Sequence, residues 1–285
     1  MKRRSLLLGL AAMVIGVVIC VVMGATRYRA YRADQRLAAQ MAQIEAGTSA
    51  QRLGCDVLAT GHPLVLLALG QSLAANHNEP GSSREAAHLF HDGRCLLAQD
   101  PLPGGTGRGG SIWPLLAALL QRPLVISVLA VDATSIDEWT RPSSPLRHRL
   151  ATHIAAMRGE NLAPSLVLWQ QGEADARGGT SAESYRAGLA MLNSILSTAG
   201  SAAPILLARS TVCRSAPSAA IRRAVQEQVE ADGRFRLGPD TDALVGPGER
   251  IDGCHLSGAG LHHAARLWKD VIETEAQRLE TTTNR

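Results

Sequence analysis

The sequence predicts an α/β fold in which a mostly parallel sheet lies between two helical layers. Its clearest strand is the run at 64–69, where consecutive apolar residues without alternation are typical of a parallel strand buried on both faces. Other short apolar runs alternate with stretches whose apolar residues recur every three or four positions. Such alternation of strands and helices favours a three-layer α/β/α sandwich.

The elements follow in order along the chain. Besides 64–69, strands are expected at 124–130, 166–169 and 205–208, with weaker or shorter candidates at 94–98 and 235–237. Helices are expected at 111–121, 146–158, 182–197 and 217–231. A last helix follows Ser257 and places Leu261, Ala264, Trp268, Val271 and Ile272 on one face.

The positive charge is concentrated at the N-terminus. Lys and Arg number 29 against 25 Asp and Glu, which gives a formal net charge of +4. Residues 1–36 hold seven of the basic residues and one acid, Asp34, so the rest has 22 basic and 24 acidic residues. The globular part therefore lacks the basic surface that is typical of nucleic-acid-binding proteins.

The first 26 residues are expected to form an uncleaved signal anchor that spans the membrane. Lys2, Arg3 and Arg4 precede an uncharged, apolar run to about Thr26, which matches the about 20 residues of a membrane span. A cleaved signal peptide and a secreted protein are the alternative. Residues 27–54 would then be a stalk, and 55–285 one domain outside the cytoplasm, periplasmic or at the cell surface.

Four of the five cysteines lie after the expected anchor, and an exported domain allows them to form two disulfides. Of the three pairings, we expect Cys55–Cys95 and Cys213–Cys254, because each pair flanks the end of a predicted strand or a site loop. Four buried free thiols are the alternative. No Cys-x-x-Cys motif occurs, so neither a redox motif nor a zinc knuckle is indicated.

Ser72 lies just past the carboxyl end of the first strong strand, where ligands bind in open α/β sheets. Serine after glycine is also common in ordinary turns. Two further loops follow predicted strands: the glycine-rich loop 100–111, which suits a phosphate or an oxyanion, and the loop 169–175, which contains Gln170, Gln171, Glu173 and Asp175.

Asp252 and His255 lie three residues apart before the last helix, so that one turn can direct both side chains towards the same site. Acyl transfer through serine requires a base, a carboxylate that orients it and donors for the oxyanion. A lone Asp-x-x-His is more often a helix-capping turn. Together with the serine turn and the two loops, however, it indicates nucleophilic catalysis.

These four motifs resemble those of the SGNH (GDSL-type) hydrolases, in the branch of sialate O-acetylesterases and related carbohydrate acetylesterases. The blocks read Gly70-Gln71-Ser72, Gly109-Gly110-Ser111, Trp169-Gln170-Gln171-Gly172-Glu173 and Asp252-Gly253-Cys254-His255. The resemblance covers about residues 60–270 and implies a flavodoxin-like sheet and no cofactor.

Carried over to this chain, the resemblance implies that Ser72 is the nucleophile, His255 the general base and Asp252 its orienting partner. The backbone N–H groups of Ser72 and Gly110 and the side-chain amide of Gln171 would form the oxyanion hole. Gln71, Glu173 and Arg250 are the expected substrate-binding residues, although Glu173 and Arg250 also suit structural roles.

Leu73 departs from the family pattern, which has asparagine after the serine; Asn76 or Asn78 could supply that polar group. Trp113 suits either core packing or stacking on a sugar ring. The pairs His88 with His91 and His262 with His263 have no third ligand at metal spacing, so the sequence predicts no metal site.

We therefore expect an extracytoplasmic serine esterase that removes acetyl groups from a carbohydrate or glycoconjugate, with an acetyl ester as its partner and no nucleic acid. The alternatives on the same fold are an acyltransferase, a hydrolase of lipid esters or thioesters, and a catalytically silent carbohydrate-binding domain.

Overall fold

The computed structural model describes residues 2–45 and 50–283 and divides into two units after Ala39. The chain begins with one long helix, α1 (Lys2–Glu45). Among the described residues, no helix combines the length and the apolar content needed to cross a membrane. Part of the anchor predicted at residues 1–26 was not covered by this finding, because the side chains of residues 1–12 lie outside the described part.

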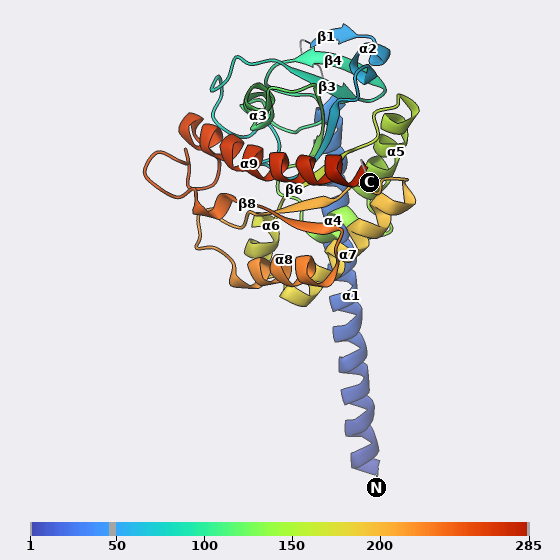
Figure 1. The fold of residues 1–285 in the computed structure, drawn as a ribbon. Coiled ribbons are helices and arrows are strands. Elements are labelled where there is room, and N and C mark those ends of the chain that lie inside the picture. The colour runs from blue at the N-terminus through green and yellow to red at the C-terminus, as the bar shows by residue number, and fades with distance from the viewer. Residues whose placement is uncertain (1, 46–49, 284–285) are drawn as a thin grey trace. The chain divides into compact units, whose positions relative to one another are not determined.

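The second unit is built on one eight-stranded sheet within the described residues, in the order β1-β4-β3-β5-β2-β6-β7-β8 (Figure 1). The strands from β3 to β8 in this order are parallel, whereas β4 and β1 add an antiparallel edge. The strands are β1 (Ala50–Leu53), β2 (Leu64–Gly70), β3 (Ala87–His91), β4 (Arg94–Ala98), β5 (Leu124–Ala130), β6 (Leu166–Gln170), β7 (Ile205–Arg209) and β8 (Phe235–Asp240).

Strand β2 lies in the middle of the sheet and pairs in parallel with β5 on one side and β6 on the other. All seven of its residues are buried. Successive side chains of a strand point to opposite faces, so Leu64, Leu66 and Ala68 join one apolar core while Val65 and Leu67 face the other layer. This explains why the run is apolar throughout and confirms the three-layer prediction.

The helices form two groups, which Figure 1 shows apart from each other. Helices α3 and α9 pack together on one face of the sheet, whereas α4, α5, α7 and α8 pack together on the other. The helices of the second unit are α2 (Cys55–Ala59), α3 (Trp113–Leu120), α4 (Ile136–Thr140), α5 (Pro145–Gly159), α6 (Glu173–Gly178), α7 (Ala182–Thr198), α8 (Ala219–Ala231), α9 (Gly258–Thr283) and the 3₁₀ turn η1 (Thr241–Ala243).

The sheet extends further towards the N-terminus than the sequence predicts. Strand β1 falls in the predicted stalk at 27–54 but pairs with β4 from Ala50 to Leu53. Strand β3 and the short helices α2, α4 and α6 are also additions. Four- to six-residue elements carry too few residues for a helical or strand periodicity to be read. Both predicted disulfides, Cys55–Cys95 and Cys213–Cys254, are confirmed.

Candidate active site

Ser72 lies in a tight turn directly after the central strand and is buried. The turn begins at Gly70, whose φ of +151° lies in the region that favours glycine. A Cβ atom at this position would come within 2.0 Å of the Gln170 carbonyl oxygen on the neighbouring strand. Gly70 therefore allows β2 to end sharply beside β6, and this places Ser72 at the carboxyl edge of the sheet.

Trp113, at the start of α3, fixes the serine turn through a hydrogen bond. Its indole Nε1–H donates to the Ala74 carbonyl at 2.7 Å, and its side chain is fully buried. Trp113 is thus a core residue that supports the turn, and it does not face a sugar site. This result decides between the two roles that the sequence allowed.

Asn76 and Asn78 connect the segment after Ser72 to the rest of the site. Asn76 Nδ2 donates to the carbonyls of Leu102 and Gly105, both at 2.9 Å, so it fixes the glycine-rich loop. Asn78 Oδ1 accepts a hydrogen bond from the Leu256 N–H at 3.0 Å. Leu256 directly follows His255, so this bond joins the serine segment to the histidine loop.

Asp252 and His255 form the hydrogen-bonded pair that the sequence predicted. His255 Nδ1 lies 3.0 Å from Asp252 Oδ2. Asp252 Oδ1 accepts the backbone N–H groups of His255, at 2.7 Å, and Cys254, at 2.9 Å. Burial alone would raise the pKa of Asp252, but these N–H donors and the Arg214 guanidinium, 2.9 Å from Oδ2, hold it well below its usual range. The carboxylate is therefore ionised and fixes the imidazole ring.

Arg250, which the sequence suggested either for substrate binding or for a structural role, stabilises this loop. Its guanidinium donates to the backbone carbonyls of Leu244 at 2.8 Å and Thr241 at 2.9 Å, and also to that of Cys254. All of these acceptors are main-chain atoms around the loop. The Cys213–Cys254 disulfide fixes the same loop to the segment after β7.

Two of the three predicted oxyanion donors are engaged elsewhere. The Gly110 N–H donates to the Asn78 carbonyl at 3.1 Å. The Gln171 side-chain amide donates to Asp175 Oδ2 at 2.6 Å and to the Thr134 carbonyl at 2.8 Å. In the described part of the chain the Ser72 N–H donates to no acceptor, so this third group remains available for an oxyanion.

Gln71 and Glu173, the other two residues expected to bind substrate, are hydrogen-bonded within the fold. Gln71 Oε1 accepts the Ala174 N–H at 3.1 Å, and Glu173 Oε1 accepts the Ser210 hydroxyl at 2.6 Å. Glu173 is fully buried, and burial raises its pKa to about 8. Both side chains are buried and hold the loop after β6 against its neighbours.

His77 and Asp132 are polar neighbours of His255 that sequence reasoning missed. The His77 and His255 rings stack with their centroids 5.8 Å apart and an interplanar angle of 27°. One ligand-type atom from each of the two histidines and from Asp132 lies within 4.8 Å of the others. His77 follows Ser72 by five residues, which was the available signal, whereas Asp132 follows β5 and reaches the site only through the fold.

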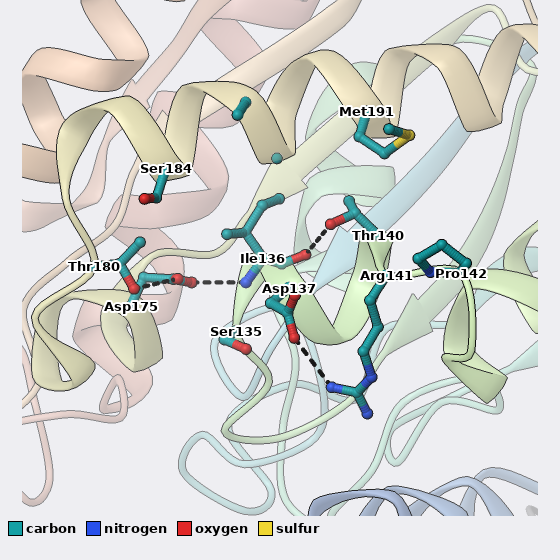
Figure 2. Close-up of a pocket in the computed structure, with 12 residues that line it drawn as sticks. Ser135, Ile136, Asp137, Thr140, Arg141, Pro142, Asp175, Thr180, Ser184 and Met191 are labelled. Atoms are coloured by element: carbon teal, nitrogen blue, oxygen red, sulfur yellow. Dashed lines mark hydrogen bonds and ion pairs between the residues drawn. The ribbon is translucent and has the colours of Figure 1, made fainter. Parts of the chain in front are cut away.

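A cavity of about 420 Å³ lies between α4 and α7 (Figure 2), and none of the residues that line it belongs to the predicted triad. Asp175 lies at its edge and accepts the Ile136 N–H at 2.8 Å and the Thr180 hydroxyl at 2.8 Å. The same carboxylate binds Gln171. Asp175 therefore connects this cavity to the loop after β6 and fixes that loop.

Comparisons with known proteins establish the fold. The sequence matches no protein-family model and no curated protein sequence. Among solved structures, a protein from Arabidopsis thaliana covers 74% of this chain and 98% of its own, with a TM-score of 0.57 and 17% identity. An aryl esterase from M. smegmatis has a TM-score of 0.50 and 13% identity, with 74% of this chain and 98% of its own covered. A putative GDSL-like lipase from Parabacteroides merdae has a TM-score of 0.51 and 16% identity, with 72% and 94% covered. The chain therefore has the α/β fold of the GDSL-type (SGNH) hydrolases.

Proposed function

We propose that the protein is a serine esterase that removes O-acetyl groups from a carbohydrate or glycoconjugate. The observation that carries this proposal is the hydrogen bond between Asp252 and His255, 3.0 Å long, on a loop bound to the segment that follows Ser72. These bonds support a site in which Ser72, from the turn after β2, meets the Asp252–His255 pair, from the loop before α9. Acyl transfer through serine needs such a nucleophile, a base and a carboxylate that orients the base.

In the proposed reaction, Ser72 Oγ attacks the ester carbonyl carbon while His255 Nε2 takes the hydroxyl proton. Asp252 stabilises the imidazolium that results, and the Ser72 N–H donates to the oxyanion. The alcohol leaves with the proton from His255, which leaves an acetyl group on Ser72. A water molecule, deprotonated by His255, then releases acetate and restores the enzyme.

The acetyl and carbohydrate specificity rests on the resemblance of the four sequence blocks to carbohydrate acetylesterases. The side chains of Gln71, Glu173 and Arg250, which were expected to bind substrate, make hydrogen bonds to neighbouring loops. The proposed serine chemistry therefore depends on Ser72, Asp252 and His255, whereas the proposed substrate depends on the sequence blocks.

We also propose that the catalytic domain acts outside the cytoplasm. Two disulfides, Cys55–Cys95 and Cys213–Cys254, support this location, because such bonds form and persist in oxidising compartments. Alkylation of the protein isolated from its native cells, with and without reduction, measures whether these four thiols are paired there. Free thiols at all four positions would contradict the proposal.

The decisive test is hydrolysis of p-nitrophenyl acetate and of longer acyl esters by the full chain and by Ser72→Ala. We expect activity with acetate, less with long chains and none in the variant. Ser143→Ala, which changes an exposed serine, is the matched control and should keep full activity. Equal activity in Ser72→Ala would disprove the assignment.

Acetylated sugars are then the substrates to screen, with release of acetate as the measurement. Acetylated product that forms only when a sugar acceptor is added would identify an acyltransferase instead. Lack of both hydrolysis and covalent labelling of Ser72 by a fluorophosphonate would identify a silent binding domain.

A further inference from the structure

The side chains of His77, Asp132 and His255 form a cluster of metal-ligand type at the candidate active site. Each offers one nitrogen or carboxylate oxygen, and these atoms all lie within 4.8 Å of one another. The residues come from three separate loops, after β2, after β5 and before α9. All three are half-buried, so an ion from solvent can reach them while part of the surrounding water is excluded.

The two histidine rings are held in the way that metal-binding histidines usually are. A ligating histidine generally uses its second ring nitrogen for a hydrogen bond that fixes the ring. His255 Nδ1 is bound to Asp252 Oδ2 at 3.0 Å, and His77 Nε2 to Thr106 Oγ1 at 3.1 Å. These bonds leave His255 Nε2 and His77 Nδ1 for a shared ligand.

The Asp132 carboxylate has no hydrogen-bond partner among the described residues. Its backbone N–H donates to Thr106 Oγ1 at 2.9 Å, the same hydroxyl that contacts His77. Thr106 therefore fixes both the ring and the backbone that carries the carboxylate. One carboxylate oxygen and two imidazole nitrogens are ligand atoms that suit a divalent transition metal.

We propose that His77, Asp132 and His255 bind a divalent transition-metal ion of the zinc class. Zinc sites with three protein ligands are well known, and Zn–N distances of about 2.0–2.1 Å place the ligand atoms roughly 3.5 Å apart. Because the ligand atoms of the cluster already lie within 4.8 Å of one another, small side-chain rotations bring them to this geometry. The bound ion occupies the Nε2 lone pair of His255.

This occupation has a consequence for the proposed esterase, on which this part of the inference rests. His255 Nε2 cannot take the proton of Ser72 while it binds a metal ion. Zinc therefore acts as a reversible inhibitor that competes with the general-base function of His255. Removal of the metal by a chelator restores activity.

A second cluster, His91, Asp92 and His153, is a weaker candidate. Its two histidines are buried. Its carboxylate, however, is already bound by the Arg149 guanidinium at 2.5 and 2.6 Å. The positive charge of Arg149 beside the cluster opposes a cation.

Isothermal titration of the metal-free full chain with ZnCl₂ tests the site directly and needs no enzymatic activity. We expect Asp132→Asn, which keeps the side-chain volume, and His77→Gln each to weaken zinc binding at least about 10-fold, since even outer-shell changes cost 10–100-fold. His88→Gln changes an exposed histidine on β3 and should leave the Kd unchanged. Unchanged zinc affinity in both cluster variants would overturn the proposal.

The esterase assay tests the inhibitory role separately. Zinc should inhibit the wild-type enzyme reversibly, and Asp132→Asn should require at least about 10-fold more zinc for the same inhibition. Tight binding without inhibition would disprove the inhibitory role while the metal site stands. If the protein has no esterase activity at all, the titration still decides whether zinc binds.

Discussion

His255 contacts Asp252 twice, through its ring Nδ1 at 3.0 Å and through its own backbone N–H at 2.7 Å. The carboxylate thus orients the imidazole and also closes the turn that carries it. This double contact explains the Asp-x-x-His spacing, because one side chain three residues upstream can reach both groups. The role of the Asp252 charge can therefore be tested separately from its role in closing the turn.

The substitution Asp252→Asn should lower kcat by up to about 10⁴-fold while the fold persists. An asparagine can still accept the backbone N–H groups, but it does not stabilise the imidazolium, and loss of this charge in a triad has an effect of this size. The measurement is kcat with the thermal midpoint as a control for folding. Arg214→Ala is the matched control: its exposed ion pair with Asp252 should contribute little, about 1 kcal/mol or less. A full loss of activity in Arg214→Ala alone would contradict this division of roles.

Removal of the Cys213–Cys254 disulfide should reduce activity more than removal of Cys55–Cys95. The two bonds close chain segments of nearly equal length, with sequence separations of 41 and 40. Each loss should therefore cost a similar free energy of unfolding, about 2–5 kcal/mol. Only the first bond fixes the loop of Asp252 and His255. Paired Cys→Ser variants, assayed below their thermal midpoints, would separate the two effects; equal losses of kcat would contradict the expectation.

Trp113→Phe should lower both the stability and the catalytic rate. The change keeps an aromatic ring in the core but leaves the Ala74 carbonyl without its indole donor, a loss of about 1–3 kcal/mol. That carbonyl lies in the Ser72 turn, so the nucleophile also becomes less well positioned. Trp139→Phe is the control, because its indole donates to Thr134 Oγ1 at 3.0 Å on the other face of the sheet. The control should lose stability with little change in kcat, as measured by denaturant unfolding and initial rates.

The buried Glu173 should make the protein less stable as the pH rises. Burial raises its pKa in the folded state to about 8, from 4.5 in the unfolded chain. Between these values the folded state binds more protons than the unfolded state, so the free energy of unfolding decreases with pH. The decrease approaches about 1.4 kcal/mol per pH unit and ends above about pH 8.

The variant Glu173→Gln should remove this dependence, since a neutral amide does not titrate. Urea unfolding at steps of about one pH unit between roughly pH 5 and pH 9 measures how the free energy of unfolding of each protein changes with pH. Glu183→Gln, at an exposed position near the start of α7, should retain the slope of the wild type. Equal slopes in the wild type and in Glu173→Gln would contradict the prediction, because they would show that Glu173 takes up no proton on folding.

The sequence by itself predicted the layered α/β fold and the Asp252–His255 pair. These features depend on local patterns: an uninterrupted apolar run at 64–69, a glycine at a sharp strand end and a spacing of three residues. Each such pattern restricts the backbone within a few residues, so it can be recognised without knowledge of the rest of the chain. Strands β1 and β3 could not be predicted from the sequence, because their short segments are stabilised by pairing with β4.

The tertiary structure alone decided which polar side chains face the site and which support it. Gln71 and Glu173 lie in the sequence blocks of the family resemblance and Arg250 lies just before the last block, yet all three side chains make hydrogen bonds to neighbouring loops. The Gly110 and Gln171 donors are likewise bound within the fold. His77 and Asp132 meet His255 only because β2, β5 and the loop before α9 end at one edge of the sheet. Which groups share a site depends on contacts between residues far apart in the chain, and such contacts leave no local pattern in the sequence.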